Sequence, residues 1–453
     1  MATATRSTIE AERMSLVDTA WLHMEMPTNL MMVGSLAFFD APLDRDRLVR
    51  VLERRLLNHP RFRERIHPAV IGPPSWEVDP LFDLAAHVHR VALPAPGGDA
   101  ELRLLVADLM STPLDMTRPL WDVHMIENHG HGSVLLTRIH HAIADGTALV
   151  RLLLGLTATT AAASLRAPRT AGAPAPNGAH HHLLAHLDPR RAVGDIVQVS
   201  AQAFTLARLT ALWPDASTSL RGGLVRAKRV AWTKPFALED LRPLREEGGY
   251  TVNDVLVTAV TGALRSHLRN GGEKLPSHVR ALVPVDMRPQ DDDGRLGNQF
   301  GLVFLDMPVG MPGRRQRLDS VHAMMQLARH SPQPSVAFEV LGALGLVPQA
   351  IQRQVVRFFG AKGTAVVTNV RGPARRLYLA GERLVNLTFF VPQSAMLGIG
   401  ISVMTYAGDI QVGVIADAGL VPEPAAIARD ITAELRALVR LGGASGGRED
   451  DGE

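Results

Sequence analysis

The chain contains no cysteine, and this absence excludes several kinds of chemistry. Without a thiol there is no thiolate nucleophile, no zinc–thiolate site, no iron–sulfur cluster and no disulfide framework. Lysine is scarce as well, with only four among 48 basic residues, and the formal net charge is no more than +3. Because a nucleic-acid-binding protein concentrates a larger cationic excess, the composition predicts no nucleic-acid partner.

Long hydrophobic runs are also missing. No stretch reaches the roughly 18 uninterrupted apolar residues of a membrane-spanning helix. Glu10, Glu12 and Asp18 stand where a signal peptide needs an apolar segment, so the N-terminus predicts a cytoplasmic protein. Peripheral contact with the inner membrane or with lipid droplets stays open, because an amphipathic segment is enough for such contact.

What the chain does have is length and an ordinary globular composition. Its 453 residues, 46% of them hydrophobic, exceed the roughly 200 residues of a large single domain and predict two domains. Segments with helical spacing of apolar residues interleave with short β-like runs, which predicts an α/β or α+β fold. Helices are expected at residues 44–59, 99–110, 147–156, 190–213 and 252–268, and strands at 32–39, 123–127, 133–140 and 279–285.

A shift in composition divides the chain. Residues 157–189 are rich in Ala, Pro and Gly and have no apolar periodicity, so they predict a linker. The linker separates an N-terminal domain, 1–156, from a C-terminal domain, 190–441, which opens with a long amphipathic bridging helix. Residues 442–453 predict a disordered tail.

The sharpest local pattern is HHAIADG, which contains His140, His141, Asp145 and Gly146. The strand before it brings both histidines to its C-terminal end, and Asp145 is placed to cap the helix that follows. Two other interpretations stay open from the residues alone: a buried, hydrogen-bonded histidine pair beside an ordinary cap, and a metal site. The metal site is less favoured, because adjacent residues of a strand point to opposite faces.

These residues favour base catalysis by a histidine. With no cysteine and no G-x-S-x-G elbow, an acyl-enzyme route through an activated serine is not indicated. A neutral histidine can instead remove the proton of a substrate hydroxyl as that hydroxyl attacks an activated acyl group. Asp145 then fixes the loop, by capping the helix or by an ion pair, without touching the substrate.

HHAIADG matches the HHxxxDG signature of the coenzyme A-dependent acyltransferase superfamily. The chain resembles one of its branches, the bacterial wax ester synthase/diacylglycerol acyltransferase family. Six further segments carry that resemblance in the right order over nearly the whole chain: MSLVDTAWLHMEMPTNLMMVG (14–34), PLDMTRPLWDVHMIE (113–127), TVNDVLVTAVTGALR (251–265), VPVDMRP with LGNQFG (283–301), TNVRGP (368–373) and GIGISVMTYAGDIQVGVIAD (398–417).

The resemblance implies two domains, each built like chloramphenicol acetyltransferase, with the active site in a tunnel between them. By match to the motif, His141 is the catalytic general base and His140 is its neighbour, which shapes the site. Gly146 matches the small residue that lets backbone and ligand approach closely. Asn253 and Asp254 match a motif near the reaction centre, where an asparagine amide can donate to the developing oxyanion. For Asn253, capping of the helix that follows is the alternative.

Two further assignments follow from the resemblance. The aspartate of the motif, here Asp145, points away from the substrate in such enzymes and pairs with an arginine. Arg288 in VPVDMRP is the candidate partner, while Arg138 is nearer in sequence. A run usually assigned to the substrate side is matched by Pro119, Leu120 and Trp121. A place in the hydrophobic core is the alternative for Trp121.

The chain also departs from the family pattern at several positions. Asn29, Leu30 and Met31 stand where many members have Pro-Met-His. Arg371 takes a proline position in TNVRGP, and Asp286 takes the place of a small residue in VPVDMRP. None of these positions is the expected base, so the departures bear on the choice of acyl acceptor.

The resemblance implies an O-acyltransferase that moves a fatty acyl group from acyl-CoA to a long-chain alcohol or to diacylglycerol. The products are a wax ester or triacylglycerol, acyl-CoA is a co-substrate, and no cofactor or metal is implied. Two alternatives are a condensation-like enzyme that takes acyl groups from a carrier protein, and a non-catalytic protein that binds lipid droplets. The amphipathic stretches 190–213 and 339–360 are candidates for lipid contact, with core packing as the more common role.

Overall fold

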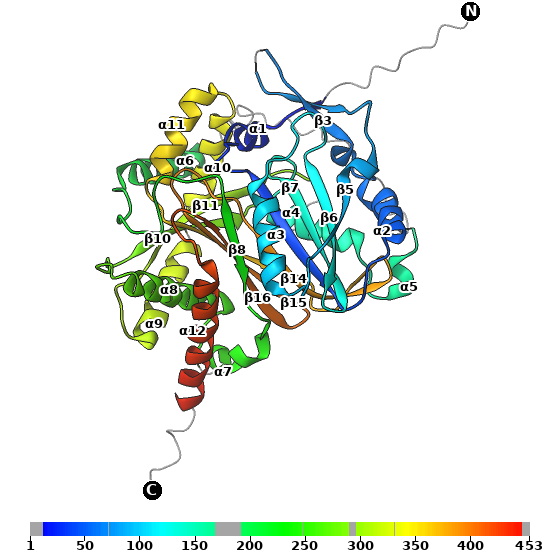
Figure 1. Ribbon diagram of the computed structural model, residues 1–453. Helices are drawn as coiled ribbons and strands as arrows, with labels where there is room; N and C mark the ends of the chain where they lie inside the picture. The colour runs from blue at the N-terminus through cyan, green and yellow to red at the C-terminus, as the bar shows by residue number, and fades with distance from the viewer. Residues whose placement is uncertain are drawn as a thin grey trace, which may run out of the picture.

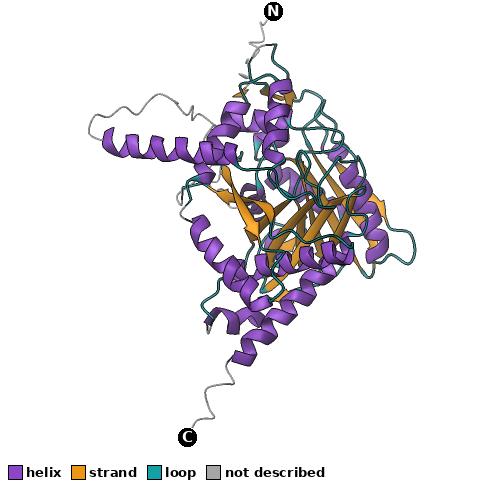
Figure 2. Cartoon of the chain, turned by 90° about the vertical axis from the view of Figure 1, so that its left-hand side faces the viewer, coloured by secondary structure: helices purple, strands orange, loops and turns teal. Residues whose placement is uncertain are grey.

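The computed structural model describes residues 12–70, 72–167, 192–246, 248–289, 296–329 and 331–445. Two large β-sheets occupy the middle of the molecule, and most of the helices lie at its outside (Figure 1 and Figure 2). The chain therefore has the mixed α/β architecture expected from its sequence. Among the helices described, none is both long and apolar enough to cross a bilayer.

The N-terminal sheet has six strands in the order β13-β14-β2-β7-β6-β5. Three of them are β2 (Met32–Phe39), β6 (Trp121–His129) and β7 (Gly132–His140), close to the strands expected from the sequence. The parallel edge strand is β5 (Val88–Ala92). The other elements of this half are α1 (Leu16–His23), α2 (Arg45–Val51) with a π-helical turn (Leu52–Leu56), α3 (Asp99–Ser111), α4 (Gly146–Leu156), α5 (Ala161–Ser164), and a small sheet of β1 (Glu12–Arg13), β3 (Glu64–His67) and β4 (Ser75–Val78).

The C-terminal sheet has seven strands, ordered β11-β10-β12-β15-β16-β8 with β9 also on β16. Its strands are β8 (Lys228–Trp232), β9 (Phe236–Ala237), β10 (Val279–Asp286), β11 (Phe300–Met307), β12 (Ala365–Arg371), β15 (Ile399–Tyr406) and β16 (Asp409–Asp417). The helices of this half are α6 (Ala192–Ala211), α7 (Arg242–Glu246), α8 (Val252–Asn270), α9 (Arg314–Arg329), α10 (Gln333–Leu344), α11 (Gln349–Gly360) and α12 (Pro424–Ser445).

The domain division expected from the sequence is wrong in one respect. Two strands of the C-terminal half, β13 (Tyr378–Leu379) and β14 (Glu382–Phe390), belong to the N-terminal sheet, where β14 pairs antiparallel with β2. Their buried side chains join the N-terminal core. The two halves are therefore connected through a shared sheet as well as through the chain between them.

The expected linker is ordered over its first residues. Ala158 forms a β-bridge with Tyr378, and Ser164 of α5 accepts a hydrogen bond from the Gly381 N–H (2.8 Å). Residues 157–167 are thus part of the N-terminal half, because they pack on the strand that crosses into its sheet. The remainder, residues 168–189, lies outside the described residues.

The structure defines two other segments. The amphipathic stretch 339–360 comprises the end of α10 and the whole of α11, since α10 ends before Gly345 and α11 begins after Pro348. A Cβ atom on Gly345 would stand 2.0 Å from the Leu16 carbonyl oxygen, so the close approach of α1 requires glycine there. At the C-terminus, α12 continues to Ser445 into the expected tail, and residues 446–453 lie outside the described residues.

The crossing strand β14 is fixed to β15 by a buried tyrosine, which gives a test of the shared sheet. The Tyr406 hydroxyl donates to the Leu384 carbonyl (3.0 Å) and accepts from the Leu377 N–H (2.8 Å). Tyr406→Phe leaves that buried N–H without a partner and should lower the free energy of unfolding by about 1–3 kcal/mol. Denaturant unfolding measures the change. Tyr378→Phe, at a half-buried tyrosine, is the control, and an equal loss in both variants would contradict the assignment.

Candidate active site

His141 lies directly after β7, at the junction of the two halves. Its backbone N–H donates to the Met31 carbonyl (2.6 Å), and its side chain is buried. The imidazole stacks on Trp21 of α1, with ring centroids 4.1 Å apart and planes 13° apart, and lies 5.6 Å from the ring of Phe300 on β11. The ring is thus held between a helix of the N-terminal half and a strand of the C-terminal half.

The amide of Asn298 determines which imidazole nitrogen of His141 carries the proton. The amide nitrogen donates to an Asp18 carboxylate oxygen (2.7 Å) and to the His141 carbonyl (2.7 Å). Both partners accept only, so the amide oxygen must face the His141 Nδ1, which lies 2.8 Å away. Nδ1 therefore carries the hydrogen, and Nε2 keeps its lone pair.

Burial sets the ionisation of His141 and of Asp18. It lowers the pKa of His141 to about 4, despite the opposing effect of Asp145, so the ring is neutral at pH 7. Burial also raises the pKa of Asp18 to about 6, against hydrogen bonds from Ser15 and Asn298. A neutral imidazole with an unprotonated Nε2 is the form that a general base requires.

His140 serves the surrounding backbone. Its Nδ1 accepts from the Ala142 N–H (3.0 Å), so its Nε2 carries the hydrogen and faces Glu25 at 3.5 Å. Glu25 also accepts from the backbone N–H of Met31, the residue that receives the His141 N–H. Among the described residues, no three His, Cys, Asp or Glu side chains are grouped to hold a metal ion.

Asp145 connects the motif to the C-terminal half. It caps α4 through the Ala148 N–H (3.0 Å) and forms a two-point ion pair with Arg288 (2.9 and 2.7 Å). It also accepts from the Gln299 N–H (2.9 Å), next to Asn298. Of the two candidate arginines, Arg288 is therefore the partner, while Arg138 pairs with Asp122 (2.7 Å).

Two cavities adjoin this arrangement. The small cavity, about 80 Å³, is almost wholly apolar and lies between the two sheets and α4, with Gly146 and Val370 in its wall. The large cavity, about 450 Å³, is lined by α1 and the loop after it, residues 222–224, α11 and residues 394–396. Each cavity has walls from both halves of the chain.

The register of β2 on β7 relates His141 to residues that line these cavities. Ser35 opposite Thr137 and Val33 opposite Ile139 line the small cavity. The next row on the same face has Met31 opposite His141, and Met31 lines the large cavity. The candidate base thus follows the row that lines the small cavity and donates its N–H to a residue of the large cavity, while its own side chain is in the wall of neither.

Asn253 lies in the first turn of α8, but it does not cap that helix. Thr251 is the cap, in a capping box with Asp254, which is buried and also lies 2.7 Å from His322 Nδ1. The alternative that Asn253 caps α8 is therefore wrong. Its side-chain oxygen accepts from the amide of Asn369 on β12, one residue before Val370 of the small cavity.

The run expected on the substrate side lies in the core. Pro119, Leu120 and Trp121 are buried, and neither cavity includes them in its wall. The Trp121 indole donates to the Phe62 carbonyl (3.0 Å) and stacks on His87 at 4.5 Å. The Leu120 carbonyl accepts the His140 N–H (2.9 Å), so the run contacts the motif from the hydrophobic core. The core alternative is therefore the correct one for Trp121.

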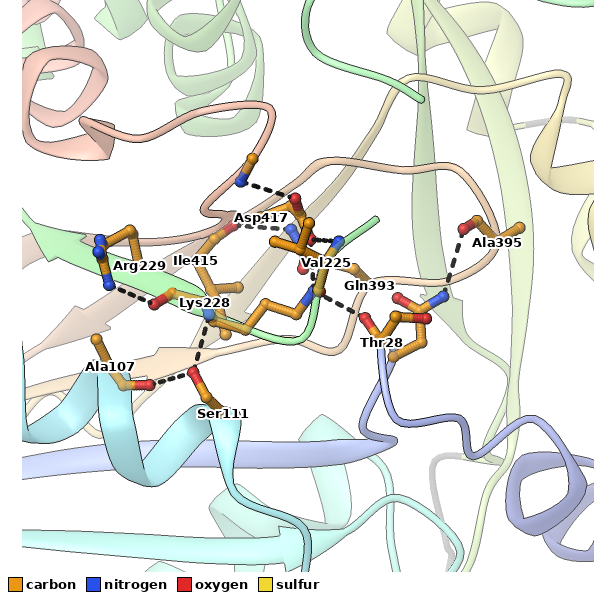
Figure 3. A network of polar contacts seen from close by, with 12 residues as sticks. Thr28, Ala107, Ser111, Val225, Lys228, Arg229, Gln393, Ala395, Ile415 and Asp417 are labelled. Carbon is orange, nitrogen blue, oxygen red and sulfur yellow. Dashed lines mark hydrogen bonds and ion pairs between the residues drawn. The ribbon is translucent and has the colours of Figure 1, made fainter. Parts of the chain in front are cut away.

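A second contact between the halves lies beside the large cavity (Figure 3). The buried Lys228 ammonium donates to Asp417 (2.9 Å) and to the carbonyl of Thr28 (2.8 Å), which lines the cavity. Its backbone N–H donates to Ser111 of α3 (2.8 Å). Burial lowers the pKa of Lys228, while Asp417 opposes that shift. This network fixes the loop before Met31, and the Met31 carbonyl accepts the His141 N–H.

Three residues of the site were not singled out from the sequence: Asp18, Trp21 and Asn298. All three lie in segments that resemble the family, MSLVDTAW and LGNQFG. Their side chains meet His141 only after the halves pack together, so no local spacing marks them. A polar residue within such a segment is the signal that was available.

Solved structures define the class of this fold. A wax ester synthase/diacylglycerol acyltransferase from Marinobacter aquaeolei VT8 matches with a TM-score of 0.70 and 22% identity, over 95% of this chain and 100% of that chain. The first condensation domain of the CDA synthetase matches with a TM-score of 0.61 and 17% identity, over 96% and 97%. The expected two-domain acyltransferase fold is thereby confirmed.

The family follows from sequence comparison. Residues 14–256 match the wax ester synthase/diacylglycerol acyltransferase catalytic domain, and residues 296–439 match the WS/DGAT C-terminal domain. A relative from Mycobacterium tuberculosis (strain ATCC 25618 / H37Rv), "Probable diacyglycerol O-acyltransferase tgs1", is 30% identical over 90% of this chain and 91% of its own. The chain belongs to the wax ester synthase/diacylglycerol acyltransferase family and is an acyltransferase.

The ion pair of Asp145 can be tested by stability. Arg288→Met leaves a buried carboxylate unpaired and should lower the free energy of unfolding by about 3–5 kcal/mol. Asp286→Ala removes exposed contacts to the guanidinium (3.2 Å) and the backbone N–H (3.1 Å) of the same arginine and should cost less than about 1 kcal/mol. Equal costs in denaturant unfolding would show that the pair does not hold the halves together.

Proposed function

We propose that the chain transfers a fatty acyl group from acyl-CoA to the hydroxyl of a long-chain alcohol or diacylglycerol. The products are a wax ester or triacylglycerol and free CoA. The observation that carries the proposal is the neutral His141 at the junction of the two halves, whose Nε2 keeps its lone pair. The printed name of the M. tuberculosis relative supports diacylglycerol as an acceptor.

In this mechanism the Nε2 of His141 takes the proton of the acceptor hydroxyl as its oxygen attacks the thioester carbonyl. A C–O bond forms, the tetrahedral intermediate collapses, and the C–S bond breaks. The imidazolium then returns the proton to the CoA thiolate. Asn298 keeps Nδ1 as the donor throughout, and the stack on Trp21 fixes the ring, so little reorganisation accompanies proton transfer. The steps call for no metal or bound cofactor.

The other residues of the motif have supporting roles in this proposal. His140 and the Asp145–Arg288 pair position the loop between β7 and α4. Gly146, which has no side chain, forms part of the wall of the small cavity. Asn253 is proposed as the oxyanion donor, with Asp254 holding its helix turn. Because the Asn253 oxygen is engaged by Asn369, its amide N–H groups remain for the oxyanion.

The cavities suit lipid substrates. The small cavity is lined by Leu, Val, Ile, Phe and Met side chains, which favour a hydrocarbon chain over a polar group. The large cavity has four methionines in its wall, together with polar residues that include Arg353 and Arg357. Both substrates carry long hydrocarbon chains, so the proposal includes peripheral contact with a membrane or a lipid droplet as the route of supply.

The catalytic assignment is tested with palmitoyl-CoA and either hexadecanol or diacylglycerol. His141→Ala should lower kcat by at least about a hundredfold, because it removes the base while the fold remains. Release of CoA thiol measures turnover, and the chain, without cysteine, adds no background. His131→Ala, at an exposed histidine, is the control.

Three outcomes would contradict the proposal. Equal thiol release from wild type and His141→Ala would exclude this base. Turnover only with an acyl carrier protein as donor would indicate a condensation-like enzyme. Lipid binding without any turnover, unchanged by His141→Ala, would indicate a non-catalytic lipid-droplet protein.

The pH dependence follows from the lowered pKa of His141. Because burial holds that pKa near 4, protonation of His141 should lower kcat/KM only with a midpoint near 4, and any change between pH 8 and about 5.5 should come from Asp18 and be absent in Asp18→Asn. The measurement is initial rate at low substrate concentration, with circular dichroism at each pH. Asp18→Asn removes the other buried group that titrates nearby, at about pH 6. A midpoint near 6.5 in both proteins would show that His141 is solvated in the working enzyme.

A further inference from the structure

The wall of the large cavity contains two arginines and no carboxylate. Helix α11 packs on α1 (Figure 1), and its cavity-lining residues have the spacing of one helix face: Gln352, Arg353, Val356 and Arg357. Arg353 and Arg357 are exposed, so they lie where the cavity opens to solvent. In the described part of the chain, no Asp or Glu belongs to this wall, and no ion pair engages either arginine.

Charged groups close to this wall already have partners. Glu25, in the loop after α1, accepts from the Met31 N–H. The Lys228 ammonium pairs with Asp417 (2.9 Å). The charge of the two arginines is therefore left for an occupant of the cavity. A guanidinium group binds a carboxylate through two parallel N–H donors, so the mouth of the cavity suits an anionic group.

The buried part of the wall holds an acceptor without a donor. Gln352 is fully buried, and its amide nitrogen donates to the Ala20 carbonyl (2.6 Å). That bond fixes the orientation of the amide, because a carbonyl only accepts. Among the described residues, no donor reaches the amide oxygen of Gln352. Ala20 precedes Trp21, whose ring stacks on His141. An unpaired acceptor this close to the candidate base indicates an occupant with a hydroxyl group.

The remainder of the wall offers apolar surface. It includes Met24, Met26, Met31 and Met396. Methionine is unbranched and polarizable, so such a wall adapts to a hydrocarbon chain. Met31 is buried, and its carbonyl accepts the His141 N–H, whereas Met396 is exposed by 38%. The wall thus joins arginines in solvent to buried residues next to His141.

These features fit the acyl acceptor better than acyl-CoA. The reacting end of acyl-CoA is a thioester, which has no hydroxyl to donate to Gln352, whereas the reacting end of the acceptor is a hydroxyl. Asn29 and Met31 of this wall also stand at positions where the chain departs from the family pattern. A plain alcohol or diacylglycerol would leave both arginines without a partner.

We propose that the large cavity selects a long-chain hydroxy fatty acid whose hydroxyl is remote from its carboxylate. The carboxylate meets Arg353 and Arg357 at the mouth, the hydrocarbon chain lies on the methionines, and the hydroxyl reaches the Nε2 of His141 near Gln352. The inference rests on the proposed acyl transfer, because it assigns the acceptor of that reaction. The acceptor oxygen forms the new C–O bond, the C–S bond of the thioester breaks, and the proton passes through His141 to the CoA thiolate. The product is an ester with a free carboxylate.

The test compares ω-hydroxypalmitate with its methyl ester, which has the same chain and hydroxyl but no charge. With palmitoyl-CoA as donor, kcat/KM of the wild type should be at least about tenfold higher for the acid, as expected for a charge-assisted pair. Arg353→Gln/Arg357→Gln should bring this ratio close to one, mainly through KM for the acid. Arg50→Gln/Arg54→Gln, an exposed pair with the same spacing in the N-terminal half, is the control and should keep the wild-type ratio. The isomer α-hydroxypalmitate, with its hydroxyl beside the carboxylate, should react no faster than the ester.

Binding without acyl-CoA separates this proposal from the proposed function. In calorimetric titrations, ω-hydroxypalmitate should bind the wild type more tightly than its methyl ester does, and Arg353→Gln/Arg357→Gln should abolish the difference. Equal binding or equal kcat/KM of acid and ester in the wild type would overturn the proposal. So would a preference for the acid that survives in the double variant, and a raised KM for palmitoyl-CoA there would then assign the arginines to the CoA phosphates. Failure of every acceptor to react would count against the acyl transfer, while the titrations would still decide what the cavity selects.

Discussion

The orientation of the Asn298 amide decides which nitrogen of His141 is free to take a proton. That orientation is fixed because the amide nitrogen meets two acceptors, the Asp18 carboxylate and the His141 carbonyl. Asp18 lies in the N-terminal half and Asn298 in the C-terminal half. The tautomer of the base is therefore a property of the packed molecule, and it exists only when the two halves are together.

Several contacts keep the halves together around this amide. The Asp145–Arg288 pair ties α4 to the segment that precedes Asn298, and the Lys228 network ties the loop after α1 to the C-terminal sheet. Strand β14 adds antiparallel pairing with β2, with a register shift between Leu384 and Asn386. Buried ion pairs contribute little net stability, but they penalise misalignment strongly, because a displaced partner leaves a charge unpaired. In this protein they hold the site residues of the two halves in their relative positions.

Local patterns predicted much of this structure. Strand β2 begins and ends at the expected residues, and the resemblance to the family implied Arg288 as the candidate partner of Asp145. Local patterns do not show which residues that are far apart in the sequence come into contact. Asn298 is 157 residues from His141, and β14 is far from β2, so only the packed fold shows these contacts. The placement of Trp121 on the substrate side was wrong for a related reason. An aromatic residue in a motif has the same local sequence pattern whether it faces the substrate or the core.

The exchange of β13 and β14 between the halves also limits how such a chain can recombine. The sequence suggests a break near residues 157–189, but the N-terminal sheet takes its edge from residues 378–390. A chimera joined at that break would pair the β2 edge of one parent with the β14 of another. A chimera that keeps the site intact thus requires β2 and β14 from the same parent, although more than 200 residues separate these strands in the sequence.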